Sequence, residues 1–271
     1  MLHMARDSAK RPGRKQYDMT SNEKGFASQN DMAEKRITFK ELARGAYAFT
    51  AEGDPNSGVV IGEDSIMVIE AQATPRLARK VIDEIRKVSD KPISHLVLTH
   101  YHAVRALGAS AYRAPHILSS QKTLEMLEER GEQDWLSEFQ RFPRLFQGHE
   151  EIPGLTWPTH TFETKMEVDL GEKRVELHHL GGGHTRGDVV VWLPDDKVLF
   201  AGDLVEFKAT PYCGDAHLKE WPLTLQKIKD LQPNSLVPGR GDALIGREQV
   251  DPVSNTHLRA HETYLLISYA V

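Results

Sequence analysis

Short apolar runs separated by polar turns fill the first part of the ordered chain, which we expect to begin near Ile37. This pattern predicts short strands at Phe39 and at residues 46–49, 58–61 and 65–69. Over residues 75–89 the apolar positions take up helical spacing, which predicts an amphipathic helix with Pro75 in its first turn. An apolar strand at residues 93–99 follows. The order strand, helix, strand predicts a parallel pair joined by a right-handed crossover.

The second part of the chain shows the same alternation. Helices are expected at residues 119–130, 132–146 and 218–231, with Pro143 breaking or kinking the second. Strands are expected at residues 115–118, 161–168, 173–179, 188–193, 198–201 and 235–237. Because each half runs from strands to a helix, we expect two α/β layers that face each other with their helices outside.

Composition narrows the class of protein. The chain has 271 residues, 39% hydrophobic and 27% charged, which is enough for a globular domain with a substantial core. A net charge of −5 offers no basic field for nucleic acid, and no apolar run has the length of a membrane span. Cys213 is the single cysteine, so no intrachain disulfide can form.

The ends of the chain differ from its centre. We expect a disordered polar leader at residues 1–36 and one folded domain at residues 37–251. Residues 252–271 form a doubtful tail, because part of it resembles the translation of sequencing-adapter read-through. The first 30 residues lack an apolar signal core, so we expect a cytoplasmic protein. The oligomeric state stays open.

Candidate chemistry gathers at the ends of the predicted strands. His100 and His102 follow the strand at residues 93–99, and imidazoles at this spacing can converge on a zinc or iron ion. His184 lies in a glycine-rich loop between two strands. Asp203 directly follows the strand at residues 198–201, and Arg240 follows the last strand within Pro-Gly-Arg-Gly. Each signal is weak alone, but their joint occurrence at strand ends predicts a site.

With these motifs the chain resembles the metallo-β-lactamase superfamily over residues 37–241. The resemblance implies an α/β fold, an αββα sandwich of two mixed β-sheets with helices on the outer faces and a metal site at the open edge between the sheets. It implies that His100, His102 and His184 are ligands of the family's first metal. It also implies that Asp203 is the carboxylate that usually bridges two metals.

The family pattern H-x-H-x-D-H is incomplete here. Val104 and Arg105 replace its aspartate and last histidine, and Arg240 replaces the histidine of Pro-Gly-His-Gly. All three lost groups belong to the family's second metal, so we expect a single ion held by His100, His102, His184 and Asp203. Zinc is the preferred metal, with Fe²⁺ and Mn²⁺ as alternatives.

The arginines and acids of this site have expected roles. We expect Arg105 and Arg240 to occupy the place of the missing cation, pairing with Asp203 or with a substrate oxyanion. Alternatively, the side chains of both arginines point into solvent as ordinary surface residues. Asp203, aided by Asp188, is the candidate acceptor for the proton of the attacking water.

The predicted function is a metal-dependent hydrolase that cleaves an ester, thioester, lactone or lactam through a metal-bound water. The expected partner is a small molecule, with an anionic group facing Arg105 or Arg240, and neither nucleic acid nor a membrane. Two alternatives stay open. One is a mononuclear iron oxidoreductase resembling the persulfide dioxygenases, and the other is a degenerate member that binds a metal or an anion without turnover.

Overall fold

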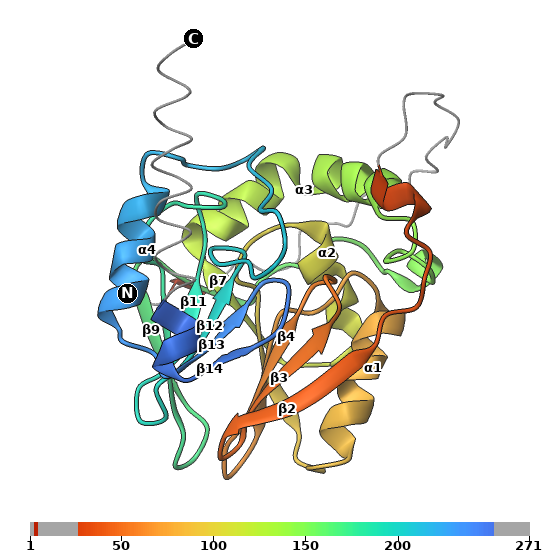
Figure 1. Ribbon diagram of the computed structural model, residues 1–271. Helices are drawn as coiled ribbons and strands as arrows, with labels where there is room; N and C mark the ends of the chain where they lie inside the picture. The colour runs from red at the N-terminus through yellow and green to blue at the C-terminus, as the bar shows by residue number, and fades with distance from the viewer. Residues whose placement is uncertain (1–2, 5–26, 252–271) are drawn as a thin grey trace.

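The computed structural model describes residues 3–4 and 27–251 and shows two β-sheets packed face to face (Figure 1). The first sheet has the strand order β1-β8-β7-β6-β5-β4-β3-β2, and the second has the order β14-β13-β12-β11-β10-β9. Both sheets mix parallel and antiparallel pairs, because β5 to β8 run parallel in the first and β12 pairs parallel with β13 in the second. Helices cover the outer faces. The predicted αββα sandwich is confirmed.

The elements have the following bounds. The strands of the first sheet are β1 His3–Met4, β2 Ile37–Ala43, β3 Ala46–Ala51, β4 Ser57–Ile61, β5 Ile66–Ile69, β6 Ile93–Val97, β7 His116–Ser120 and β8 His160–Phe162. Those of the second are β9 Lys165–Asp169, β10 Arg174–His178, β11 Val190–Leu193, β12 Val198–Gly202, β13 Ser235–Pro238 and β14 Leu244–Ile245. The helices are α1 Pro75–Arg86, α2 Ala103–Ala106, α3 Gln121–Arg141 and α4 Trp221–Asp230, with 3-10 turns η1 Ala27–Asn30, η2 Leu107–Ala111 and η3 His149–Glu151.

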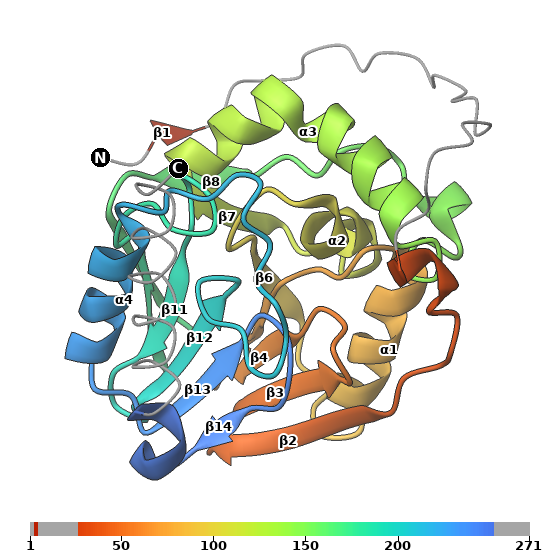
Figure 2. The ribbon, with the colours of Figure 1, turned by 45° about the horizontal axis from the view of Figure 1, so that its top comes forward.

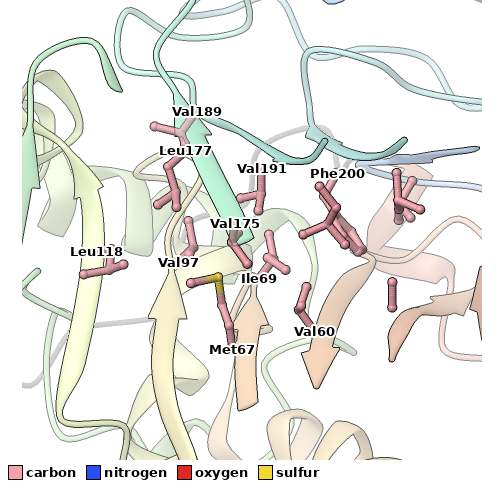
Figure 3. Close-up of a cluster of buried hydrophobic side chains, with 14 of the residues drawn as sticks. Val60, Met67, Ile69, Val97, Leu118, Val175, Leu177, Val189, Val191 and Phe200 are labelled. Atoms are coloured by element: carbon pink, nitrogen blue, oxygen red, sulfur yellow. The ribbon is translucent and has the colours of Figure 1, made fainter. Parts of the chain in front are cut away.

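The main core lies between the two sheets. Figure 3 shows apolar side chains of the first sheet, such as Met67 and Ile69, meeting Val175, Val191 and Phe200 of the second. All five are at most 2% exposed. This burial supplies the hydrophobic driving force that holds the sheets together and so fixes the relative position of their edges.

Each sheet also carries a helix on its outer face. The apolar stripe of α1, including Val81 and Ile85, packs on the first sheet, and Thr74 caps this helix by accepting from Leu77 N at 3.2 Å. Trp221 and other residues of α4 pack on the second sheet. Both helices lie where the strand–helix–strand pattern placed them.

Helix α3 lies across one end of the strands (Figure 2). It is one continuous helix, so the expected break between residues 130 and 132 was wrong. Gly131 stands at that point, where an added Cβ would lie 3.1 Å from Leu155. Its missing side chain therefore lets the helix pack closely, and the helical hydrogen bonds continue through it.

Three further sequence expectations need correction. The single strand expected at residues 161–168 is two strands, β8 and β9, which belong to different sheets. The short elements α2 and β14 were not expected, because they are too short for a periodic signal. Part of the leader is ordered, since Ser28 Oγ and Gln29 Nε2 donate to backbone carbonyls at the end of α3.

Most of the leader, at residues 1–2 and 5–26, and the tail at residues 252–271 lie outside the described residues. Strand β1 within the leader pairs antiparallel with β8. Among the described residues, none of the helices combines the length and the apolarity needed to cross a bilayer.

Candidate metal centre

The first two histidines are held by the segment that follows β6. Glu70 Oε1 accepts from Thr99 N at 2.8 Å, and Thr99 Oγ1 lies 3.0 Å from His100 Nδ1. This contact fixes the ring of His100 and directs its Nε2 away from the backbone. That nitrogen is buried and has no hydrogen-bond partner among the described residues. A buried orphan of this kind is costly unless a ligand satisfies it.

The loop that carries His184 is braced from within. Asp188 accepts from Thr185 N at 2.9 Å and from Thr185 Oγ1 at 2.7 Å. Val189 N then donates to Thr99 O at 2.8 Å, which joins this loop of the second sheet to the histidine segment of the first. Packing of the two sheets therefore brings His184 to the side of His100, with ring centroids 4.9 Å apart.

Asp203 directly follows the last residue of β12. Gly202 before it has a φ of +53°, and a Cβ there would overlap the side chain of Thr99. Only a glycine allows the chain to turn at this point without strain and close contact. The turn places Asp203 beside the histidines, where it is 3% exposed.

The four predicted ligands converge. One atom each from His100, His102, His184 and Asp203 lies within 4.8 Å of the others, and all four residues are buried. His184 Nε2 is 3.1 Å from His102 Nδ1 and 3.5 Å from Asp203 Oδ2, and His100 Nε2 is 3.6 Å from the same oxygen. Ligands about 2.0–2.1 Å from a tetrahedral zinc ion lie roughly 3.4 Å apart, so this donor set suits one ion.

The outer nitrogen of His102 has an acidic partner that the sequence did not reveal. Asp215 Oδ2 lies 3.1 Å from His102 Nε2, accepts from Tyr101 Oη at 2.5 Å, and its other oxygen pairs with Arg130 at 2.6 Å. Burial alone would lower the pKa of His102, but the hydrogen bond to Asp215 raises it. Such a partner fixes the tautomer in which Nδ1 is free to bind a metal. Asp215 lies in a loop without a strand-end signal, which is why it was missed.

Comparison with known proteins identifies the family. The model of the metallo-β-lactamase superfamily matches residues 50–240.

The chain belongs to the metallo-β-lactamase superfamily.

Three similar proteins each align with 70% or more of this chain. The type 2 metallo-β-lactamase of Bacillus cereus is 24% identical over 233 residues, which cover 84% of this chain and 81% of the relative. A linear primary-alkylsulfatase of a Pseudomonas species is 24% identical over 222 residues, covering 70% of this chain and 42% of that enzyme. The structure of a metallo-β-lactamase from Pontibacter korlensis superposes with a TM-score of 0.67 at 20% identity, covering 84% of this chain and 99% of its own. Membership in the superfamily supports the prediction that the chain is a metal-binding hydrolase.

Compared with the superfamily motif, the departures cluster on one side of Asp203. Val104 is 2% exposed and packs in an apolar cluster with Ala103 and Leu107, so its side chain offers no ligand for a cation. Arg105 is fully buried, and its Nη2 donates to Asp203 Oδ1. Arg240 Nη1 lies 3.4 Å from Asp203 Oδ2 and 3.0 Å from Glu206 Oε1. Both arginines therefore contact Asp203, as the sequence analysis expected, and neither lies free in solvent.

Two further buried acids share the surroundings of Asp203 with the two arginines. Glu70, Asp203 and Glu206 surround the two guanidiniums, and Arg105 Nε is 3.8 Å from Glu70 Oε2. Burial raises the pKa of Glu70 and of Glu206 to about 7. Burial also acts upward on Asp203, but Arg105, His100 and Arg240 hold the pKa of that carboxyl well below its usual range. Near pH 7 Glu70 and Glu206 are therefore about half ionised, so the two guanidiniums balance the three acids while Asp203 itself stays ionised and able to bind a metal.

Two of the three imidazoles, those of His100 and His184, have the protonation state that a metal requires. Burial lowers the pKa of His184 to about 3 and that of His100 well below its usual range. Both rings are therefore neutral near pH 7 and offer a lone pair, as metal binding demands.

Asn56 is a second residue that the sequence did not reveal. Its side-chain nitrogen donates to Pro238 O at 2.9 Å and to Gly241 O at 2.8 Å, and its backbone N donates to Gly239 O. These bonds tie the β3–β4 turn of the first sheet to the loop that presents Arg240. An asparagine in a polar turn carries no such signal in a sequence.

Proposed function

We propose that the chain is a hydrolase with one zinc ion that cleaves an ester, thioester, lactone or lactam of a small molecule. The convergence of three imidazole nitrogens and one carboxylate oxygen within 4.8 Å carries this proposal. Contacts from Arg105 and Arg240 to Asp203 support a single ion, because guanidiniums lie where the superfamily's second-metal ligands are missing. Fe²⁺ and Mn²⁺ are the alternatives that the same donor set allows.

His100, His102, His184 and Asp203 would hold the ion. When bound, it supplies Lewis acidity, which polarises a carbonyl and makes water more acidic. Arg105 fixes the carboxylate of Asp203, and Asp188 fixes the loop of His184 through Thr185. Because both oxygens of Asp188 are bonded within its own loop, its proposed contribution to catalysis is to position the ligand.

Substrate recognition falls to Arg240. Arg105 is fully buried and cannot reach a substrate, whereas the side chain of Arg240 is 16% exposed. Arg240 also lines a cavity of about 140 Å³, whose wall includes the acids Asp31, Glu52 and Asp54 as well as the apolar Phe142 and Leu145. The partly exposed guanidinium of Arg240, beside Asp203, is therefore the group that we expect to meet an anionic part of the substrate.

The test is elemental analysis of the purified protein followed by assays on ester, thioester, lactone and β-lactam substrates. We expect one equivalent of zinc and turnover of at least one class, with both lost after chelation. Two equivalents of metal would overturn the mononuclear site. One equivalent of iron with oxygen consumption would show an oxidoreductase, and bound metal without turnover would show a degenerate member.

A further inference from the structure

Among the described residues, three tyrosine and tryptophan rings contact the histidine ligands, and one of them reaches solvent. The ring centroids of Tyr101 and His102 are 4.6 Å apart, and those of Trp221 and His184 are 5.9 Å apart. Tyr101 is 1% exposed and Trp221 is fully buried, so both belong to the interior. Tyr212 is 36% exposed, and its ring lies 5.7 Å from that of His102 and 6.2 Å from that of His184.

The ligands are almost closed off from solvent. The most exposed of the four, His102, is 4% exposed. Because Tyr101 and Trp221 are buried as well, Tyr212 is the aromatic side chain that a small molecule can contact while it reacts beside the ligands. The loop that carries Tyr212 therefore provides an aromatic wall at the border between the metal centre and solvent.

This wall is fixed by contacts with helix α3. The guanidinium of Arg141 on α3 lies 4.6 Å from the centroid of the Tyr212 ring. Three residues later in the loop, Asp215 pairs with Arg130 of the same helix at 2.6 Å. Because the ring is held in place before a substrate binds, a contact with it costs little conformational entropy.

The ring of Tyr212, rather than its hydroxyl, lies beside the histidines. A Cβ at Gly214 would overlap the Tyr212 hydroxyl, so this oxygen lies against its own loop and the glycine makes room for it. An aromatic ring presents a large apolar surface, and two aromatic rings attract each other beyond the effect of burial alone. The side chain that borders the ligands is therefore suited to an apolar partner, and best to an aromatic one.

We propose that Tyr212 determines substrate specificity by packing against an aromatic or bulky apolar group next to the scissile carbonyl. This inference rests on the proposed function and narrows its substrate class. The ring centroid is 5.7 Å and 6.2 Å from those of two ligand histidines, so the contacted group is attached close to the carbonyl rather than at the far end of a long chain. Tyr212 exchanges no proton with the substrate.

The test compares three esters. Methyl acetate is the reference, methyl phenylacetate carries an aromatic ring on the acyl side, and benzyl acetate carries it on the leaving side. We expect zinc-loaded wild type to have a higher kcat/KM for at least one aromatic ester than for methyl acetate. In Tyr212→Ala this ratio should fall about 10-fold or more, because the aromatic contact and its buried apolar area are both lost. If wild type hydrolyses thioesters, lactones or lactams instead, matching phenyl and methyl pairs of that class are compared.

Two further variants serve as controls. Tyr212→Phe keeps the ring without its hydroxyl and should keep the wild-type ratio within about twofold. Trp157→Ala removes an aromatic side chain that is 48% exposed in the segment before β8, and this variant should keep the wild-type ratio. Zinc content should match that of wild type in all three variants, because neither Tyr212 nor Trp157 is among the four ligands.

A second readout does not depend on turnover. Acetate and phenylacetate are the acids that these esters release, and calorimetry on zinc-loaded protein measures their dissociation constants. We expect wild type to bind phenylacetate more tightly than acetate. Tyr212→Ala should reduce this preference about 10-fold, and Tyr212→Phe should retain it.

The outcomes separate the two proposals. If wild type hydrolyses no substrate class but its preference for phenylacetate is lost in Tyr212→Ala, the proposed function fails and the contact stands. If wild type is active but has no aromatic preference, or keeps that preference in Tyr212→Ala, only the role of Tyr212 fails. If wild type neither hydrolyses a substrate nor prefers phenylacetate, both fail.

Two results from the other variants also bear on the ring. Loss of the preference in Tyr212→Phe would assign the effect to the hydroxyl and overturn the role of the ring. If Tyr212→Ala does not fold or does not bind zinc, Tyr212→Leu replaces it, since leucine removes the aromatic face with less loss of packing. A wild-type ratio in that variant would overturn the role, and a lower ratio would support it.

Discussion

Replacing Arg105 by alanine should destabilise the metal-free protein strongly. This guanidinium is fully buried, donates to Asp203, reaches Asn56 O at 3.4 Å and lies 3.8 Å from Glu70. Its removal leaves buried carboxylates without their cation. Breaking a buried pair from one side costs about 3–5 kcal/mol, far more than the loss of a surface pair. A loss of that size is a large fraction of the stability of an ordinary domain.

Zinc should reduce that loss. With Arg105 absent, the full charge of Asp203 acts on the bound ion, so metal binding recovers part of the missing compensation. Each tenfold gain in zinc affinity returns about 1.4 kcal/mol at a fixed excess of free zinc. We therefore expect the cost of Arg105→Ala to be smaller in zinc-loaded than in metal-free protein.

Urea denaturation of both forms measures the two costs. Arg174→Ala is the control, because the Arg174 side chain is 46% exposed and its contacts with acids are 3.8 and 3.9 Å long. This variant should lose no more than about 1 kcal/mol in either form. A metal-free Arg105→Ala protein that lost less than about 1 kcal/mol would refute the view that this arginine neutralises a buried site. Equal costs with and without zinc would refute its electrostatic coupling to the metal.

Further predictions follow from the same geometry. His184→Ala should remove bound metal, as measured by elemental analysis, and full metal content in this variant would reject the ligand assignment. The triple change Val104→Asp, Arg105→His and Arg240→His should raise metal uptake toward two equivalents, and an unchanged stoichiometry would contradict the replaced second site. Burial raises the pKa of Glu70 to about 7, so metal-free protein should lose up to about 3 kcal/mol of stability from this group as pH rises from 4.5 to 7. Urea titrations at pH 5 and pH 8 should show a shallower loss in Glu70→Gln, and equal slopes would refute the effect.

The sandwich and the four ligands were predictable because each rests on a local signal. Strands such as β5 and β6 are continuous apolar runs, and α1 has strong helical periodicity. Three of the four ligand candidates follow an apolar run directly, namely His100, His102 and Asp203. The fourth, His184, lies in a glycine-rich loop between two such runs. Their convergence could be expected from the family resemblance, because strand ends of one sandwich meet at one edge.

The partners of these ligands were not predictable in the same way. Asp215 and Asn56 act through contacts between segments more than 100 residues apart in the chain, and nothing in their local sequence marks them. Asp134, 3.9 Å from His102 Nε2, sits on a helix that was expected to be two helices, so its face could not be assigned. For Arg105 the sequence left two orientations open, and burial decided between them, since no solvent-facing position exists at 0% exposure. Such residues can be identified only from the folded structure, which shows which polar groups are buried together in the interior.

Charge balance links the altered motif to the architecture around it. The superfamily site without its second ion would leave Asp203 beside Glu70 and Glu206 with no cation on their side of the cluster. Arg105 and Arg240 replace that ion with permanent positive charges that cannot dissociate, whereas a metal can be removed by chelation. The two arginines hold Asp203 ionised and oriented, while Val104 stands where the motif has the aspartate that would move protons. Hydrolysis of the proposed substrates at such a site would therefore need a proton carrier from outside the motif.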